Sequence, residues 1–67
     1  MHIYINSKLQ EIPATATLHE VVAMLGVAAQ NGIAIAVNNH VIPRTGWPAH
    51  LLQPDDQVTL IHATQGG

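Results

Sequence analysis

Two glycines, Gly66 and Gly67, end the chain and carry the sharpest chemical signal in the sequence. Since glycine makes up about 7% of an average protein, a pair at a chain end arises by chance roughly once in 200 sequences. A backbone without Cβ atoms passes through a narrow channel, so it is able to carry a terminal carboxylate into another protein's active site. The four residues after Ala63 reach at most about 14 Å. The pair therefore predicts a reactive carboxylate at Gly67; the alternative is a frayed tail without chemistry, or a cloning remnant.

Histidine and cysteine give no sign of a metal site. No two of the five histidines have the i, i+4 spacing that brings ligands together on a helix. We therefore expect no metal site and surface positions for these side chains, which are His2, His19, His40, His50 and His62. The absence of cysteine excludes disulfides, thiolate zinc sites, iron–sulfur clusters and a cysteine nucleophile.

Asp55 and Asp56 are the only adjacent carboxylates, and they follow Pro54. They could be read as paired catalytic acids, but aspartate after proline is far more typical of a turn, because its side chain bonds to nearby backbone. The sequence contains neither a P-loop pattern nor GxGxxG, so it lacks the glycine loops that bind nucleotide phosphates. We expect no catalytic residues and no cofactor bound by this chain.

The segment Pro43-Arg44-x-x-Trp47 contains the single tryptophan of the chain. The structural interpretation, which we favour, is that Trp47 covers an edge of the core while Arg44 bonds to nearby carbonyl groups. The functional interpretation is a contact for a partner protein, since tryptophan and arginine are enriched at interface hot spots.

The chain has 67 residues, of which 48% are hydrophobic and 9% charged. That length and composition predict a single globular domain, residues 1–67, with little structure to spare for an active site of its own. The net charge of −2 includes only two basic residues, which makes nucleic acid and anionic membranes poor partners. The sequence shows no signal peptide and no apolar run of the roughly 20 residues that a spanning helix needs. We expect a cytoplasmic protein.

The elements that position the tail follow from hydrophobic patterns. Residues 1–6 alternate as a half-buried strand does, and residues 9–13 return as the second strand of a hairpin. Thr17 and Glu20 match a capping box that opens a helix over 18–25, and Gly26 is suited to end it. Strands are expected at 33–37, 41–42 and 57–63, with an irregular stretch over 44–53 in which Leu51-Leu52 anchors the chain.

This order of elements predicts an α+β fold, a mixed sheet with one main helix packed across one face. The economical topology is the ubiquitin-like β-grasp, in which the first and last strands lie parallel in the middle of the sheet. The last strand then leads into a flexible C-terminal Gly-Gly tail, residues 64–67. The residues expected to be buried between helix and sheet are Ile3, Ile5, Leu18, Val22, Leu25, Val58 and Leu60.

The face of the sheet away from the helix is a candidate surface for a partner. If Val58 and Leu60 point to the helix, then Thr59, Ile61 and Ala63 point away from it. Ala34 and Ala36 join them if Ile33, Ile35 and Val37 belong to the core. We therefore expect a flat apolar patch, with Ile61, Thr59 and Ala36 as the contact residues, on the strand that leads into the tail.

Over its whole length the chain resembles the ThiS family of sulfur carrier proteins of thiamine biosynthesis. The resemblance rests on the length, the early helix opened by Thr17-x-x-Glu20, the acidic turn before the last strand and the terminal Gly-Gly. Its most specific part is the block Ala36-Val37-Asn38, which runs into Val41-Ile42-Pro43-Arg44-x-x-Trp47. One departure is Asp55-Asp56, where the family often has Gly-Asp; it affects only the geometry of the turn.

The resemblance implies a β-grasp fold and a carrier rather than an enzyme. In the family, a ThiF-type adenylating enzyme uses ATP to adenylate the terminal glycine carboxylate. Sulfur from a donor protein then replaces the acyl oxygen, and a ThiG-type thiazole synthase consumes the thiocarboxylate. Carried over to this chain, Gly67 bears the sulfur and Gly66 supplies the backbone freedom for threading. The alternatives are a molybdopterin-type sulfur carrier, a ubiquitin-like modifier, or a β-grasp binding module with an incidental Gly-Gly.

Overall fold

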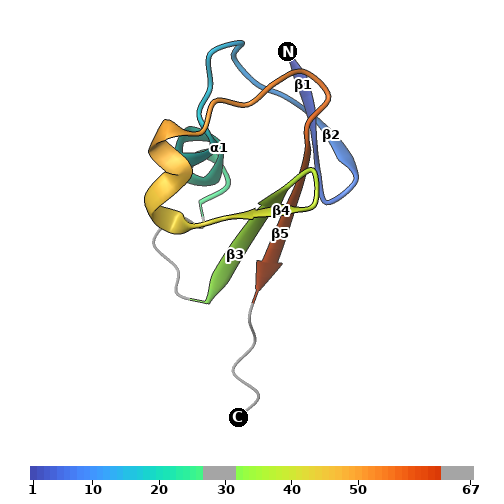
Figure 1. Cartoon of the computed structure of the whole chain (residues 1–67). Helices are drawn as coiled ribbons and strands as arrows, with labels where there is room; N and C mark the ends of the chain where they lie inside the picture. Colours follow the sequence, from blue (N-terminus) through green and yellow to red (C-terminus); the bar gives the residue numbers. More distant parts are fainter. Residues whose placement is uncertain (27–31, 63–67) are drawn as a thin grey trace.

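The elements follow one another in the order β-β-α-β-β-β in a computed structural model of the chain, which describes residues 1–26 and 32–62 (Figure 1). A 3₁₀ helix, η1, lies between the last two strands. The bounds are β1 His2–Ile5, β2 Lys8–Glu11, α1 Leu18–Met24, β3 Ile33–Val37, β4 His40–Ile42, η1 Arg44–Ala49 and β5 Gln57–His62.

The strands form one mixed sheet in the order β2-β1-β5-β3-β4. β1 and β5 are parallel, with Ile5 opposite Val58, and the other three neighbouring pairs are antiparallel. The predicted β-grasp topology, with the first and last strands side by side in the middle, is therefore confirmed. β2 begins and ends slightly before the predicted 9–13, and β4 begins one residue earlier than predicted, at His40.

Asparagine-led turns close both hairpins. Asn6 and Ser7 between β1 and β2 have φ of 49° and 69°, and Asn38 and Asn39 between β3 and β4 have φ of 51° and 70°. Two successive residues with positive φ match the twist of antiparallel strands in a two-residue turn. Asparagine adopts this conformation more readily than other residues with a side chain, so these short turns follow from the local sequence.

The predicted capping box opens α1. The Glu20 N–H donates to the Thr17 side-chain oxygen at 3.2 Å, and the Thr17 N–H donates to a Glu20 carboxylate oxygen at 2.9 Å. Gly26 follows the helix with φ of 76°. The burial of Leu25 was predicted wrongly, since its side chain is 38% exposed. Leu25 is the C-cap residue, one position past the helix, where the chain leaves the face that packs on the sheet.

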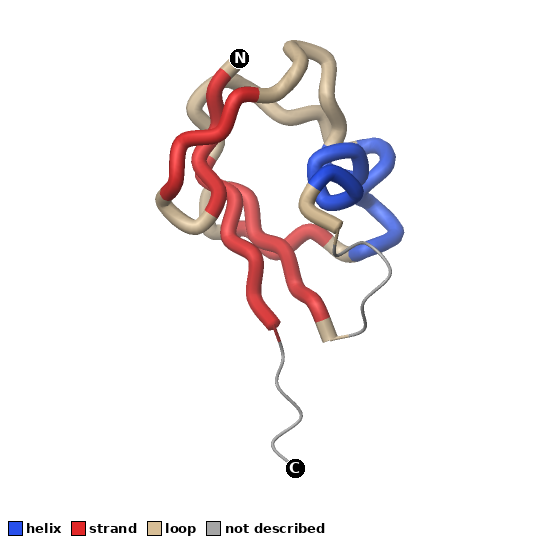
Figure 2. The backbone as a smooth tube through the Cα atoms, turned by 180° about the vertical axis from the view of Figure 1, so that it is seen from behind, coloured by secondary structure: helices blue, strands red, loops and turns tan. Residues whose placement is uncertain are grey.

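α1 lies against one face of the curved sheet (Figure 2). The core lies between them. Six of the seven predicted core residues face this space. Ile3, Ile5, Leu18, Val22 and Val58 are buried there, and Leu60 is partly buried against them. The other buried members of the cluster are Ile12, Ala16, Val21, Ile35, Val37, Trp47 and Leu52.

The stretch predicted to be irregular contains η1 and then runs beside the start of α1. The Leu18 N–H donates to the His50 carbonyl at 2.8 Å, and the Leu52 N–H donates to the Ala16 carbonyl at 3.2 Å. Only half of the predicted Leu51-Leu52 anchor is buried: Leu52 packs in the core and Leu51 is exposed. Within the described residues, no helix is long and apolar enough to span a membrane.

Candidate functional site

The candidate site is the end of the sheet from which β5 leads into the tail. Ala63, Gly66 and Gly67 lie outside the described residues. The structure therefore describes the strand that leads into the tail, β5, which ends at His62. β5 is the central strand, with β1 on one side and β3 on the other. Figure 1 shows β5 running toward the end of the domain that lies opposite the N-terminus. β3 pairs with β5 as far as His62, whereas β1 pairs with it only at Gln57 and Val58.

Asn6 supports β5 beyond the point where β1 ends. Its backbone N–H donates to the Val58 carbonyl at 2.9 Å, and its side-chain oxygen accepts from the Leu60 N–H, also at 2.9 Å. A side chain thus replaces the missing strand partner one residue before Ile61. The sequence predicts the turn at Asn6 but not this bond, because no local pattern connects residues 54 positions apart.

Asp56 holds the other end of β5. Its side chain is buried, and its carboxylate accepts from the Asn38 side chain at 3.0 Å and from the Gln53 N–H at 2.8 Å. Asn38 accepts from the Gln57 N–H at 2.9 Å. The predicted turn at Asp55 is confirmed, with φ of 67°. Both oxygens of Asp56 bind within the fold, so this residue secures the start of the central strand.

The open face is the sheet face that points away from α1. The strand register places Ile61 opposite Ala34, and Thr59 opposite Ala36. Thr59 and Ile61 are exposed, as the alternation along β5 predicts. Ala36 shares their face but is only 8% exposed, which corrects the expectation that its side chain is available for contact. It lies in the sheet interior between Thr59 and Val41, whose larger side chains flank it.

The open face holds more exposed apolar surface than the sequence indicates. Leu9 is 59% exposed, Val41 67% and Ile61 47%. The register places all three on this face, because Leu9 pairs with Tyr4, Tyr4 with Gln57, and Val41 with Ala36. These side chains come from β2, β4 and β5, and Gln57 and Thr59 lie on the same face between them. Exposed apolar side chains that share a face make it a candidate protein-interaction surface. Leu9 and Val41 were missed because strand pairing, which the sequence does not state, brings them together with Ile61.

The Pro43-Arg44-x-x-Trp47 segment forms the first turns of η1. Trp47 is buried, and its indole Nε1 donates to the Ile42 carbonyl at 2.9 Å. The favoured structural interpretation of Trp47 is therefore confirmed. The Arg44 guanidinium carbon lies 4.9 Å from the centre of the Trp47 ring, a cation–π contact. Arg44 itself is exposed.

Four of the five histidines have side chains that the structure describes. His2, His19 and His40 are exposed and His50 is half-buried. His2 is 3.0 Å from a carboxylate oxygen of Glu11 across the β1–β2 pair. Over residues 1–26 and 32–62, no group of three or more histidine, aspartate or glutamate side chains is arranged to hold a metal ion.

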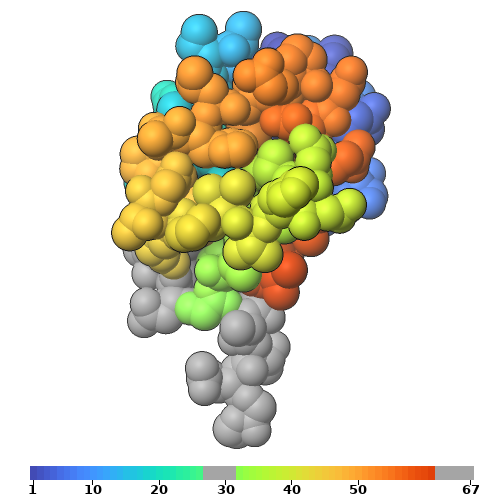
Figure 3. Space-filling model, viewed as in Figure 1, coloured from blue at the N-terminus to red at the C-terminus, as the bar shows by residue number. Residues whose placement is uncertain are grey.

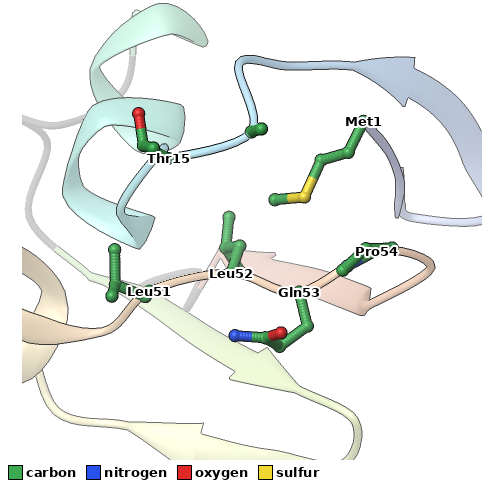
Figure 4. Close-up of a pocket in the computed structure, with 7 residues that line it drawn as sticks. Met1, Thr15, Leu51, Leu52, Gln53 and Pro54 are labelled. Atoms are coloured by element: carbon green, nitrogen blue, oxygen red, sulfur yellow. The ribbon is translucent and has the colours of Figure 1, made fainter.

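Two shallow pockets lie away from the base of the tail. One, of about 240 Å³, is lined by Met1, Ala14, Thr15, Leu51, Leu52, Gln53 and Pro54 (Figure 4). No charged side chain lines it, and it is smaller than typical small-molecule sites, which measure roughly 300–1,000 Å³. The other, of about 390 Å³, is lined in part by His40, His50 and Asp56. In this second pocket both oxygens of Asp56 already accept hydrogen bonds within the fold.

Comparison with known proteins gives consistent matches over the whole chain. The family model described as "ThiS family" matches residues 3–67. The curated "Sulfur carrier protein ThiS" of Escherichia coli (strain K12) is 34% identical over 67 residues, which cover 100% of both chains. The crystal structure of the thiamine biosynthesis protein (ThiS) from Geobacter metallireducens has a TM-score of 0.85 and 22% identity and covers 100% of both chains. The NMR structure of a thiamine biosynthesis protein from the same organism has a TM-score of 0.78 and 22% identity, over 100% of this chain and 88% of that one.

Proposed function

The chain belongs to the ThiS family, and we propose that it is a sulfur carrier of thiamine biosynthesis that bears its sulfur on the Gly67 carboxylate. The single observation that carries this proposal is the match to the family over residues 3–67, which includes the terminal Gly-Gly. The fold supports it, because the central strand β5 leads directly into the tail.

The proposed chemistry takes place on partner proteins in the cytoplasm. A carboxylate oxygen of Gly67 attacks the α-phosphorus of ATP on a ThiF-type enzyme, and pyrophosphate leaves. Hydrosulfide supplied through a donor protein then attacks the acyl carbon, the bond to AMP breaks and a proton is released, which leaves a thiocarboxylate for a ThiG-type thiazole synthase. Because the chain has no cysteine, sulfur has no thiol to occupy, and the terminus is the group that fits.

Mass spectrometry of the intact chain tests this function. After incubation with ATP, a sulfide source and the purified ThiF-type enzyme of the same cell, we expect the mass to rise by the difference between sulfur and oxygen. The added mass should map to the peptide that contains Gly67. Covalent conjugates to other proteins in cell extract would instead identify a modifier, and an unaltered mass in both experiments would leave only a binding module.

We further propose that the partner enzyme contacts the open face around Ile61. An apolar face next to the base of the tail lets a partner grip the domain while the tail points into its active site. Three of the six large exposed hydrophobic side chains among the described residues, Leu9, Val41 and Ile61, lie on this face. Thr59 contributes contact area beside them, and Ala36 contributes little, because it is buried.

The substitution Ile61→Glu is expected to weaken binding to the adenylating enzyme roughly tenfold or more, because it places a charge in a desolvated apolar contact. The melting temperature should stay close to that of the wild type, since Ile61 is exposed. Isothermal titration calorimetry measures the affinity. Leu51→Glu is the matched control, because Leu51 is also an exposed apolar residue but lies outside the sheet. Equal losses for both variants, or none for Ile61→Glu, would place the docking surface elsewhere.

A further inference from the structure

β5 loses its neighbouring strand on one side before it reaches the tail. β1 ends at Ile5, so it pairs with β5 only at Gln57 and Val58. On the other side, β3 pairs with β5 as far as His62. Beyond Val58, β5 is therefore paired with a strand on one edge only. This second half of β5 carries Ile61 and leads into the tail.

Asn6, the first residue after β1, takes the place of the missing strand. Its backbone N–H donates to the Val58 carbonyl, and its side-chain Oδ1 accepts from the Leu60 N–H, each at 2.9 Å. The first bond continues the pairing of β1 with β5 by one step, and the second continues it by another step through a side chain. Figure 3 shows the first hairpin (blue) on the molecular surface, next to the segment that contains β5 (orange to red).

The residue type at position 6 meets two separate requirements. The turn requires a positive φ, which is 49° here, and glycine, asparagine and aspartate adopt this conformation more readily than most residues. The bond to the Leu60 N–H requires a side-chain acceptor. Glycine meets only the first requirement, whereas asparagine and aspartate meet both. Substitution at Asn6 is therefore able to separate the turn from the contact with β5.

The contact between Asn6 and Leu60 is exposed, and Asn6 is not a member of the core. Water is able to bond to the Leu60 N–H if the side chain is removed, so the loss in global stability is small. The effect falls on the second half of β5, which keeps strand pairing only with β3. Loss of the contact therefore loosens the end of the strand without unfolding the domain.

We propose that Asn6 is a positioning residue for adenylation, which acts through the backbone of Leu60. It fixes the end of β5 and thereby the relation between Ile61 on the open face and the strand end that leads into the tail. When a partner holds the domain by the open face, this relation sets how often the Gly67 carboxylate meets ATP in a productive geometry. The inference rests on the proposed carrier function and adds a residue that controls the geometry of the reaction.

ATP–pyrophosphate exchange with the purified ThiF-type enzyme, measured over a range of carrier concentrations, tests the proposal. Asn6→Gly keeps the turn and removes the acceptor. Its kcat should fall roughly threefold to tenfold, because the carboxylate reaches the productive geometry less often. Its KM should stay within about twofold of the wild type, because the docking residues are unchanged. Asn6→Asp keeps an acceptor and should restore most of kcat.

Amide hydrogen exchange, followed by NMR in the free chain, gives a readout that does not depend on the enzyme. The Leu60 amide should exchange roughly twofold to tenfold faster in Asn6→Gly, as expected for the loss of one hydrogen bond. In Asn6→Asp it should exchange nearly as in the wild type. The Tyr4 amide is the internal control, because it donates to the Asp56 carbonyl at the other end of β5. Equal acceleration of both amides would indicate global destabilisation and overturn the proposal.

Asn39→Gly is the matched control variant. Asn39 is also an exposed asparagine with positive φ in a two-residue turn, but that turn joins β3 to β4. We expect its kcat and KM to match the wild type. A normal kcat for Asn6→Gly, equal losses for Gly and Asp at position 6, a rise in KM alone, or the same loss in Asn39→Gly would overturn the proposal. If the wild type is not adenylated, the carrier function fails and the role of Asn6 fails with it; if it is adenylated, only the role of Asn6 is at stake.

Discussion

A chain that lacks Gly67, or that carries one extra residue after it, is expected to lose adenylation completely while its melting temperature stays unchanged. The reaction needs a carboxylate at a set distance from the base of the tail. Deleting Gly67 moves the carboxylate back by about 3.5 Å, and an added residue moves it forward by the same amount. A displacement of even 1 Å at a reacting group can cost about a hundredfold in rate. Stability is unaffected, because the core residues all come earlier in the chain.

ATP–pyrophosphate exchange with the purified ThiF-type enzyme provides the measurement. Gln65→Ala is the control, since it alters the tail but keeps both its length and its terminal Gly66-Gly67. That variant should exchange at close to the wild-type rate. Full exchange by the extended chain would show that the terminal carboxylate is not the reacting group, and the carrier proposal would then be wrong.

Local sequence patterns predicted the elements that carry the tail. The capping residues Thr17 and Glu20 mark where α1 begins, and the alternation along β5 separates Val58 from Thr59 and Ile61. Both signals depend on residues within a few positions of one another. Such information is present in one sequence, because a capping box spans one helical turn and a strand repeats every two residues.

Features that depend on strand pairing were not predictable in the same way. Leu9 and Val41 join Ile61 on the open face only through the register of the sheet. The bond from Leu60 to Asn6 depends on the same register. Leu25 shows that the end of a helix is also hard to predict. Its spacing continues the apolar face of α1, but the helix ends one residue earlier and Leu25 is exposed. Periodicity therefore predicts a face but not where an element stops or which strand lies beside it.

Different polar side chains support the two ends of β5. Asp56 and Asn38 secure its start, and Asn6 secures it next to the tail. Asp56, Asn38 and Asn6 accept from the backbone N–H groups of Gln53, Gln57 and Leu60, respectively, which would be costly to leave unpaired. The bond from Asn38 to Asp56 joins the first two of these side chains. The strand that leads into the tail is therefore hydrogen-bonded near both of its ends.

Leu18→Ala is expected to unfold a large part of the population at room temperature. Leu18 is 0% exposed, and truncating a buried leucine leaves a cavity that typically costs about 2–5 kcal/mol. A domain of this length has a total stability of only about 3–10 kcal/mol. The loss therefore approaches the whole stability at the lower end of that range, and the urea midpoint should fall sharply.

Leu25→Ala is the control for this prediction. It tests whether the loss of stability comes from truncating a buried leucine or from truncating any leucine at this helix. It makes the same chemical change at the end of the same helix, but at a side chain that is 38% exposed, so its cost should be below about 1 kcal/mol. Urea unfolding followed by Trp47 fluorescence reports both variants, because Trp47 is buried in the same core. Comparable midpoints for the two would mean that Leu18 does not support the packing of α1 on the sheet. We expect the urea midpoint to fall much further for Leu18→Ala than for Leu25→Ala. That result would show that α1 packs on the core through its first turn, beside the His50 carbonyl, and contributes little packing at Leu25.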